Sequence, residues 1–368
     1  LATWSPAGKQ RLKESLYAEA SLGNPVDVVA TANADHYHAA VDTLLQEEGV
    51  DMVLVFFVTA PFTDTAAIAT RLKEAISTSK KPTVIVIETY EKYQPLIDEL
   101  RGAGIPVYEF AEHGARALAG MARYAEIKRR QWDAPPDLKV DKARVEQLVA
   151  PHVGQGTYLS QADAFAVLAA YGIPAPKLHR VAGVADLDAA AAVVGFPCVL
   201  KVDSADVIHK SDEGGVALGI ADRKALETAF GSMRDRFAGK NASFVVQEQR
   251  PKARELIVGV KACPGLGSLV MFGLGGVLVE VIRDVSFALA PLGRAEAREL
   301  VHEIKGYPVL EGVRGEAPVD QPALEELLCR VSRLAADFPA IAEMDLNPVF
   351  AYPAGTAPAA VDVRIKIA

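Results

Sequence analysis

Two short apolar runs rich in β-branched residues constrain the first third of this chain most strongly. They cover residues 50–58 and 82–88, and continuous runs of this kind are typical of strands buried on both faces of a parallel sheet. Residues 64–79, between them, carry apolar side chains at helical spacing, and 105–108 forms a third strand-like run. This alternation predicts a parallel, doubly wound α/β unit over residues 23–130.

A second unit of a different kind is expected beyond a proline-containing segment. Residues 131–150 are interpreted as a linker, because Pro135 and Pro136 cannot continue a helix. Within 151–368, adjacent strands predominate in the middle, which predicts an α+β domain. Residues 1–22 form one amphipathic piece, interpreted as the tail of an upstream domain. Strands are expected at 197–202, 216–220, 243–249, 255–261, 268–273 and 277–283, and helices at 160–171, 184–194, 222–237, 294–305 and 321–336.

Composition excludes several classes of protein. The chain has 368 residues, of which 50% are hydrophobic and 23% charged, which describes a globular protein of two or three domains. A formal net charge of -8 argues against a general nucleic-acid binder, and no apolar run is long enough to cross a membrane. Cys198, Cys263 and Cys329 are far apart, which is typical of reduced thiols in a cytoplasmic protein.

One lysine at the end of a predicted strand is the first candidate for chemistry. Lys201 closes an apolar run that should be buried, where an ammonium group is costly unless it meets an anion. It is therefore either a ligand of nucleotide phosphates or a lysine that points into water just beyond the strand.

The loop after Lys201 favours the phosphate interpretation. Gly214 and Gly215 let backbone amides approach an anion closely, while Lys210 and Ser211 supply a charge and a hydroxyl. His209 is a candidate phosphoryl acceptor, because a neutral imidazole nitrogen is nucleophilic near neutral pH. The alternative for His209 is a loop histidine without a special role.

Polar residues also flank two later strands. Gln247 and Glu248 end a strand, where backbone groups can face an adenine edge and Glu248 can accept a ribose hydroxyl. Glu255 begins the next strand and is a further candidate nucleotide ligand. For both glutamates the alternative is a solvated charge at the edge of a sheet.

Four oxygen-bearing side chains near the C-terminus suggest a metal site. Glu343, Asp345 and Asn347 alternate by two, so they share one face of a strand, and Asp362 is expected on a neighbouring strand. Mg²⁺ binds through one or two protein oxygens together with nucleotide phosphates. We therefore predict Asn347 and Asp362 as magnesium ligands, against the alternative of a solvent-facing strand.

In the first unit, a helix begins directly after the run 50–58. Thr63 or Asp64 can cap it, followed by Thr65. The free amides at this helix start, together with the helix dipole, suit a phosphate or a phosphohistidine.

These motifs, taken in order, resemble the ADP-forming acyl-CoA synthetases, the relatives of succinyl-CoA synthetase. Residues 155–366 resemble their ATP-grasp domain, and residues 23–127 resemble their flavodoxin-like ligase domain through Asn24–Asp27 and the turn 59–65. The motifs that carry the first resemblance are Ala169–Pro176, Val199–Val202, His209–Val216, Val246–Glu248, Glu255–Gly259, Gly275–Glu280 and Asp345–Pro348.

The resemblance implies a flavodoxin-like domain followed by a two-lobed ATP-grasp domain, and it implies a chemistry. ATP and Mg²⁺ phosphorylate a carrier histidine, the phosphoryl group passes to a carboxylic acid, and the thiol of coenzyme A attacks the acyl phosphate. The roles implied for single residues are phosphate binding for Lys201, adenosine binding for Gln247 and Glu248, magnesium binding for Asn347 and Asp362, a second phosphoryl carrier for His209, and a cradle for the phosphohistidine near Thr63.

The family also needs a coenzyme A-binding domain and a phosphohistidine domain. No Gly-x-Gly-x-x-Gly loop follows a strand and no His-Ala-Gly-type segment occurs here. We therefore expect a missing half, on the same polypeptide or on a separate subunit of a homo- or hetero-oligomer. Two alternatives stay open: the ligand-sensing half of a protein acetyltransferase and a stand-alone ATP-grasp carboxylate–amine ligase. The acid and the choice between ADP and GDP also stay open.

Overall fold

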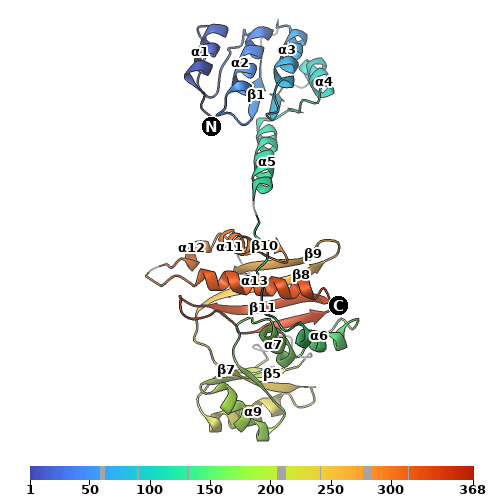
Figure 1. Cartoon of the computed structure of the whole chain (residues 1–368), viewed down its shortest axis with the longest axis vertical. Helices are drawn as coiled ribbons and strands as arrows, with labels where there is room; N and C mark the ends of the chain where they lie inside the picture. Colours follow the sequence, from blue (N-terminus) through green and yellow to red (C-terminus); the bar gives the residue numbers. More distant parts are fainter. Residues whose placement is uncertain are drawn as a thin grey trace. The chain divides into compact units, whose positions relative to one another are not determined.

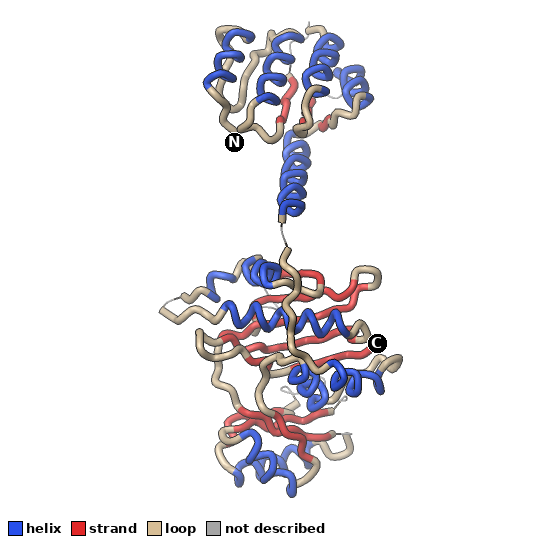
Figure 2. Tube along the Cα trace, in the orientation of Figure 1, coloured by secondary structure: helices blue, strands red, loops and turns tan. Residues whose placement is uncertain are grey.

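The protein is described from a computed structural model that covers residues 1–58, 63–88, 91–130, 132–204, 213–240, 242–276, 284–313 and 315–368. It divides into two compact units, Leu1–Gln131 and Trp132–Ala368 (Figure 1). Helices surround a small parallel sheet in unit 1, whereas longer antiparallel strands dominate unit 2 (Figure 2). In the described part of the chain, no helix combines the length and the hydropathy that a membrane span needs.

Unit 1 is built around a three-stranded parallel sheet in the order β1-β2-β3. Phe57 and Ile85 pack against α2, α3 and α4 on one face. On the other face, a Cβ added to Gly114 of α5 would lie 3.0 Å from a methyl group of Val86. Helices thus cover both faces, as predicted. The elements are α2 (Ala34–Gln46), β1 (Val53–Phe57), α3 (Thr65–Ser77), β2 (Thr83–Ile87), η1 (Glu91–Tyr93), α4 (Gln94–Gly102), β3 (Val107–Tyr108) and α5 (Ala111–Arg129).

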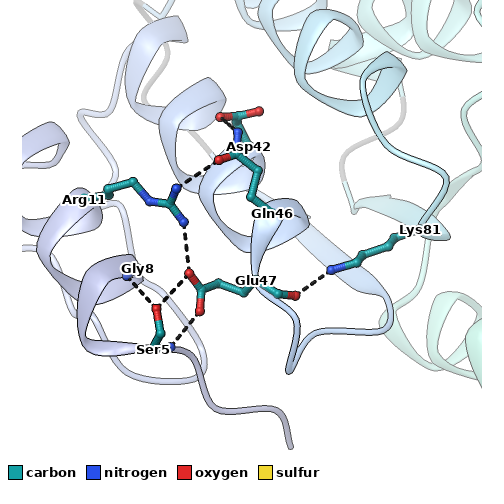
Figure 3. Close-up of polar contacts among 7 residues, drawn as sticks. All are labelled: Ser5, Gly8, Arg11, Asp42, Gln46, Glu47 and Lys81. Carbon is teal, nitrogen blue, oxygen red and sulfur yellow. Dashed lines mark hydrogen bonds and ion pairs between the residues drawn. The ribbon is translucent and has the colours of Figure 1, made fainter.

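The N-terminal segment packs against α2 through α1 (Pro6–Ser15). Leu12 of α1 is fully buried in a small apolar cluster with Ala40. Glu47, directly after α2, is 6% exposed and accepts hydrogen bonds from the Ser5 amide at 2.6 Å and from Arg11 Nη2 at 2.9 Å (Figure 3). Residues 1–22, which the sequence set apart, are therefore part of unit 1 as the structure divides it.

The smaller sheet of unit 2 is four-stranded and antiparallel, in the order β4-β7-β5-β6. Leu200 and Val246 face a core shared with α8 and α9. Because side chains alternate along a strand, Lys201 and Gln247 project from the opposite face. We call this sheet with its helices the small lobe. Its elements are β4 (Leu178–Val181), η3 (Val184–Asp186), α8 (Leu187–Val194), β5 (Cys198–Asp203), β6 (Val216–Ile220), α9 (Arg223–Arg236) and β7 (Ser243–Glu248).

The larger sheet has six strands in the order β10-β9-β8-β11-β12, with β13 paired to β11. One face packs against α13, which runs along the sheet in Figure 1, and Met344 and Leu346 lie in that core. We call this sheet with its helices the large lobe. Its elements are α6 (Lys142–Val149), η2 (Ala150–His152), α7 (Gln161–Ala170), β8 (Arg254–Cys263), β9 (Gly267–Leu274), β10 (Val285–Leu289), α11 (Arg294–His302), α12 (Tyr307–Leu310), α13 (Gln321–Asp337), β11 (Ile341–Ala351), β12 (Ala359–Ala360) and β13 (Val363–Ile367).

Most predicted elements of unit 2 are confirmed, including α7, whose start is capped by the Ser160 hydroxyl. The predicted strand 277–283 lies outside the described residues. The expected linker 131–150 differs from the structure, because its second half forms α6. Val145 and Val149 are four residues apart on that helix and are buried in the core of the large lobe.

Candidate functional site between the two lobes of unit 2

Lys201 crosses from the small lobe to the large lobe. Its side chain is 8% exposed, so the alternative in which it points into water is wrong. Lys201 Nζ donates to the backbone oxygen of Val361 at 3.0 Å and lies 3.7 Å from Asp362 Oδ1. A buried ammonium needs such anionic and carbonyl partners to offset its lost hydration. The lysine therefore sits where the small lobe meets the carboxylates of the large lobe.

Gln247 shares the same acceptor from the neighbouring strand. It is fully buried, and its Nε2 donates to the Val361 oxygen at 3.0 Å. Its other amide atom, Oε1, is buried without a hydrogen-bond partner among the described residues. The Val361 carbonyl thus receives two donors from the small lobe and holds the turn before β13 against it.

Asp345, Asn347 and Asp362 line one cavity of about 190 Å³ on the open face of the larger sheet, together with Val363 and Arg364. Asp345 and Asn347 share the outward face of β11, as the alternation predicted. Asp362 lies in the turn before β13, and its backbone oxygen accepts from the Asn347 amide at 3.3 Å. Burial raises the pKa of Asp345, and the charge of Asp362 raises it further while Arg364 opposes the shift.

The chemistry of this cavity fits a hard divalent cation. Two carboxylates and an amide oxygen are the donor types that Mg²⁺ takes, and Asp362 Oδ1 is buried without a hydrogen-bond partner in the described chain. No group of three His, Cys, Asp or Glu side chains within the described ranges is arranged to hold a metal. A cation here would need further oxygens, such as those of a phosphate chain.

The described end of the loop after Lys201 lies beside the lysine, because Val216 pairs with Lys201. Gly214 adopts a positive φ of 70°, and a Cβ there would lie 1.8 Å from Arg236 Nη1, which donates to the Gly214 oxygen. The Gly215 oxygen accepts from the Val202 amide at 2.8 Å. Gly214 is therefore explained by local packing, and an anion is not needed to account for it. His209, Lys210 and Ser211 lie outside the described residues.

The backbone amides at the end of β7 already have hydrogen-bond partners, which the sequence did not suggest. The Glu248 amide donates to the Lys177 oxygen at 2.8 Å, and the Gln249 amide donates to the Pro197 oxygen at 3.4 Å. The backbone amide of Glu248 is therefore already bonded, so the expectation that it faces an adenine edge is wrong. The Glu248 carboxylate accepts from the Lys177 amide and from Arg250, both at 3.1 Å. Glu255 is exposed at the start of β8.

Comparisons with known proteins agree with this geometry. Residues 152–367 match the model of the ATP-grasp domain family. The subunit beta of acetate–CoA ligase (ADP-forming) I from Pyrococcus furiosus is 35% identical over 57% of this chain and 93% of that protein. This chain belongs to the ADP-forming acyl-CoA synthetases. It is 37% identical to "Acetate--CoA ligase [ADP-forming] I" of Archaeoglobus fulgidus, over 97% of this chain and 52% of that protein. The chain therefore spans about half the length of this relative.

A solved structure of this family also resembles more than half of this chain. A solved chain of dinucleotide-forming acetyl-coenzyme A synthetase 1 from Candidatus Korarchaeum cryptofilum is 36% identical, with a TM-score of 0.54. The match covers 61% of this chain and all of that chain.

The residues predicted as a phosphohistidine cradle lie in unit 1, at the start of α3. Asp64 caps α3 with Oδ1, which accepts from the amides of Ala66 and Ala67 at 3.1 and 3.0 Å. Of the two capping candidates, Asp64 is thus confirmed. Its carboxylate occupies two of the amides that the sequence offered to a phosphate, so a cradle at Thr63 and Thr65 stays a prediction.

Sequence reasoning missed two groups of the interlobe site. The Val361 carbonyl, on which Lys201 and Gln247 converge, is a backbone atom and leaves no signal in the residue type. Arg364 lies opposite Asp345 in the register of β11 and β13. The alternation of Val363 to Ile367 does mark Arg364 as outward-facing, but the partner strand becomes visible only in the folded chain.

Proposed function

We propose that this chain is the nucleotide-binding part of an ADP-forming acid–CoA ligase and binds ATP with Mg²⁺ between the lobes of unit 2. One observation carries the proposal: Lys201 of the small lobe reaches the Val361–Asp362 turn beside a carboxylate-lined cavity. The Korarchaeum relative was solved in complex with coenzyme A and Mg-AMPPCP, with its "phosphohistidine segment pointing towards nucleotide binding site", which supports the same use of this cleft.

Each group has a role in this proposal. Lys201 neutralises charge on the nucleotide phosphates, and Gln247 and Glu248 lie along the adenosine. Asn347 and Asp362 hold Mg²⁺, with Asp345 beside them. Bound magnesium supplies charge neutralisation and alignment of the phosphates.

His209 is proposed to accept the phosphoryl group. A bond forms between its imidazole nitrogen and the γ-phosphorus while the bond to the bridging oxygen breaks, and ADP leaves. The imidazole proton passes to solvent. The phosphoryl group then passes to the phosphohistidine of the other half and from it to a carboxylate, and attack by the coenzyme A thiol gives the acyl-CoA and inorganic phosphate.

In this proposal, the later steps of the reaction use groups that lie outside this chain. The acid and coenzyme A are assigned to a coenzyme A-binding and phosphohistidine-bearing half, on the same polypeptide or on another subunit. The Pyrococcus relatives are named as separate beta subunits, which supports a modular enzyme of this kind. The chain alone is therefore expected to bind nucleotide without completing a thioester.

Calorimetric titration with Mg-AMPPCP tests the nucleotide site. Lys201→Met should weaken binding by about tenfold to a hundredfold, because it removes a charged donor to phosphate. Lys224→Met is the matched control, since Lys224 is exposed on α9, on the other side of the small sheet. Equal affinity of Lys201→Met and wild type would remove the interlobe site from the proposal.

Labelling with γ-³²P-ATP tests the phosphoryl step separately. Wild-type protein should retain acid-labile label, and His209→Ala should lose it. Equal labelling of both proteins would exclude His209 as the carrier without affecting the nucleotide site.

A further inference from the structure

The Lys201 ammonium already compensates one of the carboxylates proposed to hold magnesium. Its Nζ lies 3.7 Å from Asp362 Oδ1, and that oxygen has no hydrogen-bond partner among the described residues. The Asp362 carboxylate is only partly buried and also lines the cavity of about 190 Å³ on the larger sheet. One carboxylate is thus shared between a cation of the protein and the place proposed for the metal.

The ammonium is held in this position by the backbone. Lys201 Nζ donates to the Val361 oxygen at 3.0 Å, and its side chain is 8% exposed. The carbonyl that holds it belongs to the residue directly before Asp362, so the lysine and the carboxylate stay together. Because a buried ammonium that left this carbonyl would lose its partners, the lysine does not withdraw when a metal ion approaches. The positive charge beside Asp362 is therefore a fixed part of the site.

The other charges of the cavity are balanced in the same way. In the described chain, its remaining charged lining residues are Asp345 and Arg364, which lie opposite each other on β11 and β13. Two carboxylates are thus compensated by two cations of the protein. A divalent ion added alone would leave the cavity with a net positive charge, where repulsion is stronger than in bulk water. The cavity consequently attracts a free metal ion much less than its carboxylates alone would.

We propose that Lys201 restricts this cavity to metal–nucleotide complexes by excluding the free divalent cation. The inference rests on the proposed nucleotide site. Phosphate oxygens bring the negative charge that the lysine and the metal ion can share, and Mg²⁺ is held in proteins by one or two carboxylates together with such phosphates. In this arrangement Lys201 determines specificity, because its charge makes the binding of the metal conditional on the nucleotide.

Titration of the full chain with Mn²⁺ in the absence of nucleotide tests this exclusion, with the free ion measured by electron paramagnetic resonance. Mn²⁺ takes the same oxygen ligands as Mg²⁺. Lys201→Met removes the ammonium and leaves an unbranched side chain, so it should gain a site that binds Mn²⁺ at least about tenfold more tightly than wild type does. Adding Asp362→Asn to Lys201→Met should abolish the gain. Lys224→Met, which removes an exposed cation of α9, is the matched control and should bind Mn²⁺ as wild type does.

A second comparison does not depend on the folding of the lysine variant. Without nucleotide, Asp362→Asn should bind Mn²⁺ as wild type does, because the exclusion already keeps the ion from this carboxylate; with AMPPCP present, the same substitution should weaken Mn²⁺ binding. Weaker Mn²⁺ binding by Asp362→Asn without nucleotide would overturn the exclusion. So would equal Mn²⁺ affinities of folded Lys201→Met and wild type. Failure of AMPPCP to bind the wild type would instead contradict the proposed function, since the exclusion is measured without nucleotide.

Discussion

One carboxylate joins three helices behind the larger sheet, and it allows a quantitative test. The hydroxyl of Tyr171, which is fully buried after α7, donates to Asp337 Oδ2 at 2.8 Å. Asp337 ends α13 and also accepts from Lys142 of α6 at 2.8 Å and from Arg333 at 2.9 Å. The perturbation we choose is Tyr171→Phe, which removes the hydroxyl and retains the ring that packs edge-on against Phe338.

The loss of stability expected for Tyr171→Phe follows from the charge of the acceptor, Asp337. A hydrogen bond to a charged group stabilises a fold by about 1.5–3 kcal/mol. Because Asp337 keeps its two cationic partners, we expect the lower end, about 1.5 kcal/mol. For a unit of this size the corresponding fall in Tm is about 3–6 °C.

Differential scanning calorimetry near neutral pH measures this shift. Tyr158→Phe is the control, because Tyr158 is 51% exposed. The Tm of this variant should stay within about 1 °C of wild type. Coincident melting of Tyr171→Phe and wild type would refute the argument that this hydroxyl holds the helices together.

The stabilisation that the Tyr171–Asp337 hydrogen bond contributes depends on pH, and the pKa of Asp337 gives the sign of this dependence. Burial raises the pKa of Asp337, but hydrogen bonds from Lys142, Arg333 and Tyr171 outweigh it and hold the pKa below its ordinary value of 3.8. The stabilisation is therefore complete above pH 3.8, and it is lost as the pH falls through the lower pKa that Asp337 has in the folded state. The difference in Tm between Tyr171→Phe and wild type should shrink in that acid range.

Three further predictions concern the N-terminal contact and the metal site, and a fourth variant, Gly120→Ala, is the control for the second of them. The Ser5 amide, together with Arg11, lowers the pKa of Glu47 although burial opposes the shift, so Glu47→Gln should lower the urea midpoint near neutral pH, and this difference should vanish in acid. Gly8→Ala should destabilise unit 1, because its Cβ would lie 2.4 Å from Glu47 Oε1. Gly120→Ala, in an open helical position, should instead stabilise by about 0.4–1 kcal/mol in the same denaturation assay. Asp362→Asn should weaken Mg²⁺-dependent AMPPCP binding by about tenfold or more while leaving metal-free binding nearly unchanged, and titrations with and without Mg²⁺ distinguish these outcomes.

Local pattern accounted for most of the secondary structure. The alternation of Glu343, Asp345 and Asn347 placed these side chains on one strand face, and β11 has that arrangement. The same reasoning failed for α6. The proline pair upstream led to the prediction of a linker that extends over this helix, whereas Val145 and Val149 anchor the helix in the core. Burial, and not propensity, decides the fate of so short a helix.

The candidate site was predictable as a list of residues and unpredictable as a set of contacts. The position of Lys201 at a strand end marked it for an anion, yet its partners lie 160 residues away in the turn at Val361. Nothing in the residue type of Gln247 indicates which amide atom is engaged, since that depends on an oxygen of the backbone 114 residues later.

The amino-acid order alone thus specified strands, helices and the faces of each strand, because side-chain periodicity is a local property of the chain. It also specified which residue types are available for phosphate and magnesium. Folding decided that Lys201 and Gln247 donate to one carbonyl, that Asp362 lies beside Lys201, and that Gln247 Oε1 is left as a buried acceptor. These outcomes depend on the packing of two sheets that are remote in sequence, and local periodicity carries no information about such contacts.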